Sequence, residues 1–249
     1  MTTFKAHLLV SVIGLTLGCA GANASAIYYY ANWTSGTLSS LTNGSASGII
    51  ATSQGMVNVS YTGDVAAPTQ VNNIGYDYFS SYAAIYSDAA VSNKPLRVDI
   101  IALSQSHAFA DTLTFSTPVT NPILDIVSLG SVYQGTTYVF NATPTILSQG
   151  SGAYGGCNTC LSVSGKTLTG HEGDGVVQFL GTYSQLSWTT AGGEYWNGFT
   201  VGVAGLAGNR ASDGDTASPT PEPATWVNLL ISALLMMPYL FRNRKPHGK

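Results

Sequence analysis

Thr112-Leu-Thr-Phe-Ser-Thr-Pro-Val-Thr-Asn-Pro-Ile-Leu-Asp-Ile-Val-Ser-Leu129 contains two candidate β-strands separated by a turn signal. Thr112–Phe115 alternates between polar and apolar residues, as a half-buried strand does. Thr117–Pro122 carries two prolines, which cannot donate backbone hydrogen bonds, and is expected to break the strand. Ile123–Leu129 then forms a second strand. The stretch therefore predicts short antiparallel strands joined by tight turns.

The same pattern recurs on both sides of this stretch. Further apolar runs rich in β-branched and aromatic residues are Met56–Tyr61, Leu96–Leu103, Thr137–Phe140, Thr145–Leu147, Val176–Leu180, Gln185–Trp188 and Gly198–Val203. Short strands at this spacing, punctuated by Gly, Pro and Asn, are typical of a two-sheet sandwich. We predict an all-β body over residues 27–208, folded as a single jelly-roll-like β-sandwich.

Two segments of the body fit this pattern less well. Thr34–Ser53 is rich in Ser, Gly and Thr, and we expect a pair of edge strands there. Tyr76–Tyr86 places Phe79, Tyr82 and Tyr86 at helical spacing, which indicates a short helix covering one end of the sandwich.

The composition excludes nucleic acid as a partner. Only 8% of the residues are charged, against about 25% in a typical chain. Residues 27–218 carry four Lys or Arg and eleven Asp or Glu, a net charge of −7. Phosphate binding requires the opposite sign.

The N-terminus has the pattern of a cleaved signal peptide over residues 1–26. Lys5 provides the positive charge, an apolar run follows, and Ala24-Ser25-Ala26 is a small-residue cleavage site. A cut at Ala22-Asn23-Ala24 and a lipoprotein reading of Cys19 are the alternatives. We expect export through the Sec machinery and cleavage by signal peptidase.

The C-terminus has three parts in a fixed order after a flexible linker at 209–220. Pro221-Glu222-Pro223 is followed by an apolar run at 224–241 and by Arg242 and Arg244. The sixteen residues from Trp226 would rise about 24 Å as a helix, close to the thickness of a hydrocarbon core once two more residues are added. We expect a transmembrane helix in the inner membrane with its basic end in the cytoplasm.

This order resembles the PEP-CTERM sorting signal of Gram-negative bacteria, over residues 221–245. The resemblance implies that an exosortase-like membrane enzyme processes the tail near Pro221, and that the body reaches the outer surface or the extracellular space. A plain membrane anchor is the alternative. The same tail is sometimes labelled an ice-binding C-terminal domain, but the body lacks a periodic Thr-x-Thr ladder.

Cys157 and Cys160 remain after removal of the signal peptide, and we predict a disulfide between them. A redox Cys-x-x-Cys motif belongs at a helix start, and a zinc site would need two more soft ligands.

Two candidate binding sites stand out in the body. Glu194, Tyr195 and Trp196 place an acid beside two aromatic rings, a combination typical of carbohydrate-binding faces. Glu172 and Asp174 lie in a Gly-rich turn with oxygen ligands suited to calcium, although a plain hydrophilic hairpin loop is the alternative.

Signs of catalysis are weak. Glu172 and Glu194 would form a glycosidase pair only if both faced one cleft. The sequence contains no nucleophile elbow, zinc-protease motif or P-loop. We therefore expect an exported, non-catalytic surface or matrix protein without a cofactor, associated with exopolysaccharide or biofilm. A carbohydrate-binding module is the alternative, and a secreted hydrolase is a third hypothesis.

Overall fold

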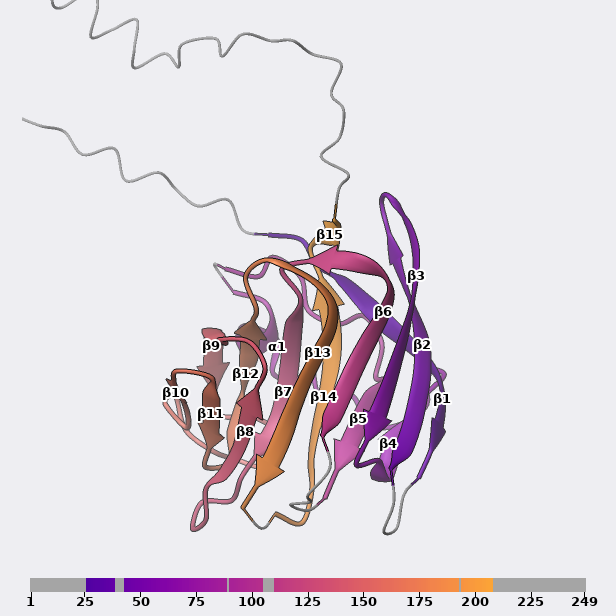
Figure 1. The fold of residues 1–249 in the computed structure, drawn as a ribbon. Coiled ribbons are helices and arrows are strands. Elements are labelled where there is room, and N and C mark those ends of the chain that lie inside the picture. Colours follow the sequence, from indigo (N-terminus) through magenta and orange to yellow (C-terminus); the bar gives the residue numbers. More distant parts are fainter. Residues whose placement is uncertain (1–25, 39–42, 89, 105–109, 193, 208–249) are drawn as a thin grey trace, which may run out of the picture. The chain divides into compact units, whose positions relative to one another are not determined.

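The computed structural model describes residues 26–38, 43–88, 90–104, 110–192 and 194–207, and nearly all regular structure in them is β. Every pairing between strands is antiparallel (Figure 1). The all-β prediction is confirmed.

The strands form one long sheet that bends into two layers. The large layer runs in the order β10 (Leu161–Ser164), β11 (Thr167–Gly170), β8 (Thr136–Phe140), β13 (Thr182–Ala191), β6 (Asp111–Thr120), β3 (Gly55–Gly63), β2 (Gly44–Thr52) and β1 (Tyr29–Thr37). The small layer continues with β14 (Asn197–Val203), β7 (Ile123–Leu129), β12 (Gly173–Gln178) and β9 (Thr145–Gly150). Three further strands pair outside this order: β5 (Ile100–Leu103) pairs with β14, β4 (Ala66–Gln70) pairs with β5, and β15 (Gly205–Leu206) pairs with β6.

The sheet is nearly closed on itself. Strand β1 joins the layers, because Tyr29 and Tyr30 pair with β14 whereas the residues from Ala31 onward pair with β2. At the two ends of the sheet, the Leu161 N–H in β10 donates a 2.8 Å hydrogen bond to the Gln149 side chain in β9. Few strand edges are therefore left open.

Aromatic side chains fill the space between the layers. Tyr61 and Trp188 from the large layer contact Phe199 of β14, with ring centroids 5.3 and 5.4 Å away. All three side chains are buried, and edge-to-face packing of this kind adds to the free energy gained from burial. The alternating residues that marked the strands in the sequence are thus the residues of the core.

The segment at Thr34–Ser53 is more central than expected. It contains the last four residues of β1, Thr34–Thr37, which pair with β2, and all of β2, which lies inside the sheet between β1 and β3. The edge-strand prediction is wrong for β2, where small residues allow close pairing: a side chain at Gly48 would overlap the Asn32 carbonyl at 2.5 Å.

The prolines at Thr117–Pro122 do not break β6 where expected. The strand continues to Thr120, and its partner changes from β3 to β15 as it passes the exposed Pro118. A register shift in β13 near Tyr183 accompanies the change. A proline is tolerated at such an irregularity because no ladder hydrogen bond is required of its nitrogen.

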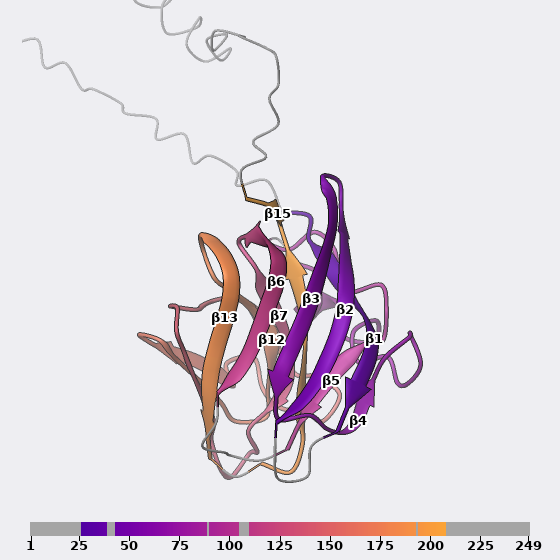
Figure 2. The same ribbon diagram turned by 45° about the vertical axis from the view of Figure 1, so that its right-hand side comes forward.

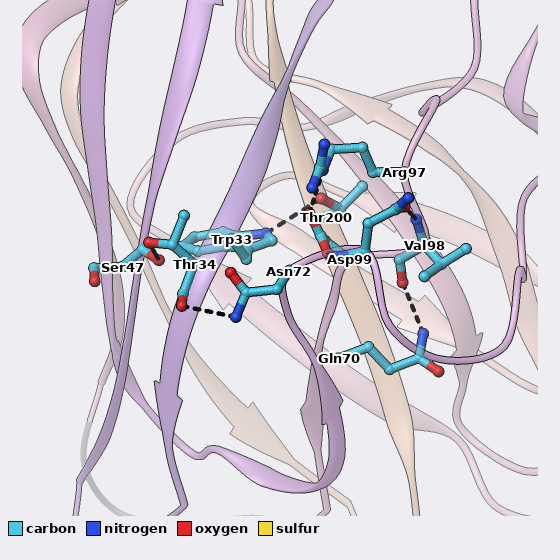
Figure 3. A network of polar contacts seen from close by, with 10 residues as sticks. Trp33, Thr34, Ser47, Gln70, Asn72, Arg97, Val98, Asp99 and Thr200 are labelled. Carbon is cyan, nitrogen blue, oxygen red and sulfur yellow. Dashed lines mark hydrogen bonds and ion pairs between the residues drawn. The ribbon is translucent and has the colours of Figure 1, made fainter.

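The expected strand Leu96–Leu103 is shorter than predicted, since only β5 is extended. Before β5, Arg97 forms an ion pair with Asp99 at 2.9 Å, and the Gln70 amide donates a 2.7 Å hydrogen bond to the backbone carbonyl between them (Figure 3). These side-chain contacts hold the backbone in a turn instead of a strand.

The aromatic segment Tyr76–Tyr86 covers the outer face of the small layer and not an end of the sandwich. Only α1 (Ala83–Tyr86) within it is helical. Phe79 and Tyr86 pack with Val127 and Val176 of the small layer in a second apolar cluster. Figure 2 shows the small layer behind the large one; strands β7 and β14 are buried on both faces as a result.

Candidate functional site: a pocket with two carboxylates and three aromatic rings

The end of β7 and the turn that follows it hold three carboxyl groups, which come from positions more than 40 residues further along the chain. The Ser128 N–H donates to Asp174 at 3.2 Å, and the Ser128 hydroxyl donates to Glu172. The Gly130 N–H donates to Glu194 Oε2 at 2.6 Å. Strand β12, the turn before it and the loop before β14 thereby meet at Ser128 and Gly130.

The backbone at this turn adopts left-handed conformations. Ser128 has a φ of 58°, Gly130 a φ of 75° and Glu172 a φ of 60°. Left-handed backbone is costly for residues with a side chain and persists only where the surroundings enforce it, often at functional sites. The hydrogen bonds of Ser128 and the 3.1 Å bond from the Glu172 N–H to the Gly130 carbonyl provide that enforcement.

A pocket of about 510 Å³ opens beside this turn. Its lining combines two carboxylates, three aromatic rings, two serines and a short apolar wall, contributed by Glu172, Glu194, Tyr154, Tyr195, Trp196, Ser128, Ser131, Ala67 and Pro68. We call it the carboxylate–aromatic pocket. Its volume lies within the range of about 300–1,000 Å³ that is usual for small-molecule sites.

The aromatic side of the pocket is a cluster of rings that pack against one another at tilted angles. Trp196 lies 5.2 Å from Tyr78 and 5.3 Å from Tyr154 between ring centroids, and the hydroxyls of the two tyrosines are 3.2 Å apart. Trp196 is half-buried, whereas Tyr195 is 97% exposed. The cluster therefore offers a ligand the Trp196 ring, which is held by its neighbours, and the exposed Tyr195 ring.

Burial shifts the protonation of the Glu194 carboxyl group. It raises the pKa of Glu194 to about 7, and the charge of Glu172 acts in the same direction, while hydrogen bonds from Gly130 and Asn197 oppose the shift. The Thr136 hydroxyl also lowers the pKa of Glu194 slightly, although it forms no hydrogen bond of good geometry. Glu194 is therefore poised to change charge near neutral pH.

The pKa of a second carboxyl group, that of the buried Asp174, is shifted in the same direction. Burial raises the pKa of Asp174 to about 7, against the opposing effect of its hydrogen bonds from Ser128 and Tyr86. Asp174 is 1% exposed and does not reach the pocket lining. Its role is to anchor the turn, not to contact a ligand.

The predicted carbohydrate residues Glu194, Tyr195 and Trp196 do lie together, but in the loop before β14 and not on the face of a sheet. Glu172 joins them in the pocket, although the sequence places it in a separate candidate site. Glu172 and Glu194 line one cavity, which meets one condition of the hydrolase hypothesis.

The calcium hypothesis gains no support. Within the described ranges, no group of three or more His, Cys, Asp or Glu side chains could hold a metal ion. Glu172 and Asp174 point to different surroundings, one into the pocket and one into the interior.

Cys157 and Cys160 lie at disulfide distance, with their sulfurs 2.17 Å apart, as predicted. Their loop connects β9 to β10, and the Cys160 carbonyl accepts a 3.0 Å hydrogen bond from His171 N–H. The same loop carries Tyr154 to the pocket. The disulfide thus closes a turn that supports the site.

Two contributors to the pocket were missed in the sequence. Ser128 has a weak signal there, a polar residue followed by Leu129-Gly130 at the end of an apolar strand. Tyr154 has no signal beyond its neighbouring glycines, because its place in the site depends on packing against Tyr78 and Trp196.

The expected signal peptide, the linker, the transmembrane helix at 224–241 and the sorting residues Pro221, Glu222, Pro223, Arg242 and Arg244 lie outside the described residues, apart from Ala26. Among the residues that the structure does describe, no helix has the length and apolar character needed to cross a bilayer.

Comparisons with known proteins give no assignment. No family model, no curated protein and no solved structure matches the chain.

Proposed function

We propose that the chain is an exported, non-catalytic surface or extracellular-matrix protein whose β body binds exopolysaccharide through the carboxylate–aromatic pocket. The observation that carries this proposal is the convergence of Trp196, Tyr195 and Tyr154 with Glu172 and Glu194 around one cavity. Sugar rings stack on aromatic faces, and carboxylates accept hydrogen bonds from sugar hydroxyls.

The rigidity of the pocket supports binding. Glu194 is held by the Gly130 N–H at 2.6 Å and by the Asn197 amide at 3.0 Å, so it does not need to be ordered by the ligand. A preorganised acceptor costs less entropy on association. We also infer that the two layers form a jelly-roll-like sandwich, with the pocket among the loops at one end of its strands.

The proposed localisation of the protein is inferred from its C-terminal residues. The order of Pro221-Glu222-Pro223, apolar run and Arg242/Arg244 supports insertion in the inner membrane, followed by processing and release to the surface or the extracellular space. The partners are then the Sec machinery, signal peptidase and an exosortase-like enzyme.

The sorting proposal is tested by expression of the full-length chain in a Gram-negative host that has an exosortase. We expect a truncated, released product from the wild-type chain and membrane-retained, unprocessed chain from the Arg242→Ala/Arg244→Ala variant. The Lys249→Ala variant, which removes one positive charge outside the arginine pair, is the control. Equal processing of all three chains would contradict the sorting proposal.

The pocket is tested by calorimetric titration of the purified full-length chain with neutral hexasaccharides, with chromatography of the sugars afterwards. Saturable binding with intact sugars is the expected result. The absence of binding to every glycan would contradict the carbohydrate proposal.

A second candidate function is glycoside hydrolysis, because Glu172 and Glu194 share the cavity and the pKa of Glu194 is raised to about 7. In that case the same chromatography would show shorter sugars, and Glu194→Gln would abolish their release.

A further inference from the structure

The charges around the carboxylate–aromatic pocket are unbalanced. Glu172 and Glu194 line the pocket, and none of its lining residues is basic. The Lys and Arg residues of the described ranges are engaged elsewhere: Lys94 with Ser80, Arg97 with Asp99 and Lys166 with the Asn141 carbonyl. Among the residues that the structure describes, the two carboxyl groups therefore share a cavity without a counter-cation.

Each carboxyl group also keeps one oxygen available. The hydrogen bonds from Ser128, Gly130 and Asn197 go to Oε1 of Glu172 and Oε2 of Glu194. From the described residues, no hydrogen bond of good geometry reaches the second oxygen of either group, although the Thr136 hydroxyl lies close enough to Glu194 to lower its pKa. A ligand that donates several hydrogen bonds and carries positive charge would complete this arrangement.

The aromatic rings that line the pocket together with the carboxylates favour the same kind of ligand. Tyr154 and Tyr195 are 55% and 97% exposed, and Trp196 has the largest π face of the three. Aromatic faces attract ammonium groups by about 0.5–2 kcal/mol, depending on how far the contact is desolvated. A cavity walled by rings and carboxylates is thus complementary to an ammonium group on an otherwise uncharged, ring-shaped molecule.

We propose that the carboxylate–aromatic pocket selects glycans that carry a free, protonated amino group, such as polymers of unacetylated glucosamine. This inference rests on the proposed carbohydrate function and names its ligand class. The pyranose ring would stack on Trp196, and the ammonium group would lie between the carboxyl groups of Glu172 and Glu194.

Protonation of Glu194 links this selection to pH. Glu172 and Tyr138 interact electrostatically with Glu194, and Tyr154 and Tyr195 line the same pocket. His171 and Asp174 lie one and two positions from Glu172 in the chain. A bound cation favours the ionised form of Glu194. The affinity for a permanently charged cation should therefore rise as the pH increases through about 7.

The test is calorimetry of the full-length chain with three matched hexamers: β-1,4-linked glucosamine, N-acetylglucosamine and glucose. We expect the glucosamine hexamer to bind at least about tenfold more tightly than the two neutral hexamers at pH 7. Glu172→Gln and Glu194→Gln, which keep size and shape, should each erase this ratio. Asp88→Asn removes an exposed carboxyl outside the pocket and should leave the ratio unchanged.

A second measurement needs no variant. Tetramethylammonium should compete with the glucosamine hexamer on the wild-type chain, and more effectively at pH 8 than at pH 5.5. Equal affinity for the three hexamers would overturn the amino-group inference and leave the carbohydrate proposal standing. The absence of binding by all three would overturn both. If Asp88→Asn erased the preference for the glucosamine hexamer as fully as the pocket variants do, the preference would come from the net charge of the protein. That result would also overturn the inference.

Discussion

The Gly130 N–H points at the Glu194 carboxylate across 2.6 Å, although the two residues are 64 positions apart in the chain. Gly130 is held in a left-handed conformation, and a side chain there would overlap the Gly170 carbonyl at 2.0 Å. The close approach of these backbones places the donor under the carboxylate. The geometry of the pocket therefore depends on a residue that contributes no side chain.

We expect Gly130→Ala to destabilise the fold strongly. A Cβ atom would add overlap with rigid backbone to the cost of about 1–2 kcal/mol for a left-handed alanine. Gly165→Ala is the matched control, because Gly165 has a φ of 58° and open space around it. Urea denaturation should show a loss at least about 2 kcal/mol larger for Gly130→Ala than for the control. Equal losses would show that the backbone at Gly170 moves aside.

Tyr86→Phe tests the contact between the aromatic segment Tyr76–Tyr86 and the strands that carry Ile126 and Asp174. The buried Tyr86 hydroxyl lies 3.0 Å from the Ile126 carbonyl and 3.3 Å from Asp174 Oδ1, and its removal leaves two buried acceptors without this donor. We expect a loss of about 1–3 kcal/mol in the free energy of unfolding. Tyr133→Phe, at a side chain that is 98% exposed, should change it by less than about 0.5 kcal/mol. A Tyr86→Phe protein as stable as the wild type would contradict these contacts.

The raised pKa values make the stability fall as the pH rises. Glu194 and Asp174 titrate near 7 in the folded chain, and the pKa of the buried Asp125 is raised well above its usual range. Their unfolded values are about 4. The folded state therefore binds more protons than the unfolded state above pH 4, so each group destabilises the fold increasingly up to its folded pKa.

Denaturant midpoints at pH 5 and pH 8 measure this effect. We expect the fold to be less stable at pH 8, by on the order of a few kcal/mol in the free energy of unfolding. Asp174→Asn and Glu194→Gln should each flatten the profile. A profile that is level or rises between these pH values would contradict the proposed protonation states.

Reduction of the disulfide should affect the site more than the fold. The bond between Cys157 and Cys160 closes a loop of only four residues, so chain entropy limits its contribution to about 2 kcal/mol. The loop carries Tyr154 against Trp196, and its loosening should weaken glycan binding severalfold. Titration with and without reductant measures this, and the Cys157→Ser/Cys160→Ser variant should show no response to reductant. Unchanged affinity for the glycan in the reduced wild type would mean that Tyr154 stays against Trp196 without the disulfide.

The sequence predicts the strands well where one face is buried. Val57, Val59 and Tyr61 alternate with exposed residues, and β3 extends through them as expected. The prediction fails where pairing or side-chain contacts override local preference. Pro118 is tolerated because the partner of β6 changes there, and Arg97 lies in a turn because of contacts with Asp99.

The site was predictable only in pieces. Glu194, Tyr195 and Trp196 are adjacent in the chain, so their combination is visible in the sequence. Their meeting with Glu172 follows from the order of strands, which no local pattern encodes. The role of Ser128 depends on a left-handed turn that its residue type does not favour.

The most direct test of the account is the affinity of the full-length chain for glycan hexamers, compared with its Trp196→Ala and Leu180→Ala variants. Leu180 is 65% exposed and is not part of the pocket lining. We predict saturable binding by the wild type and by Leu180→Ala, and a loss on the order of tenfold or more in Trp196→Ala, because the stacking ring is removed. Equal binding by all three proteins, or binding by none, would contradict a carbohydrate site in this pocket.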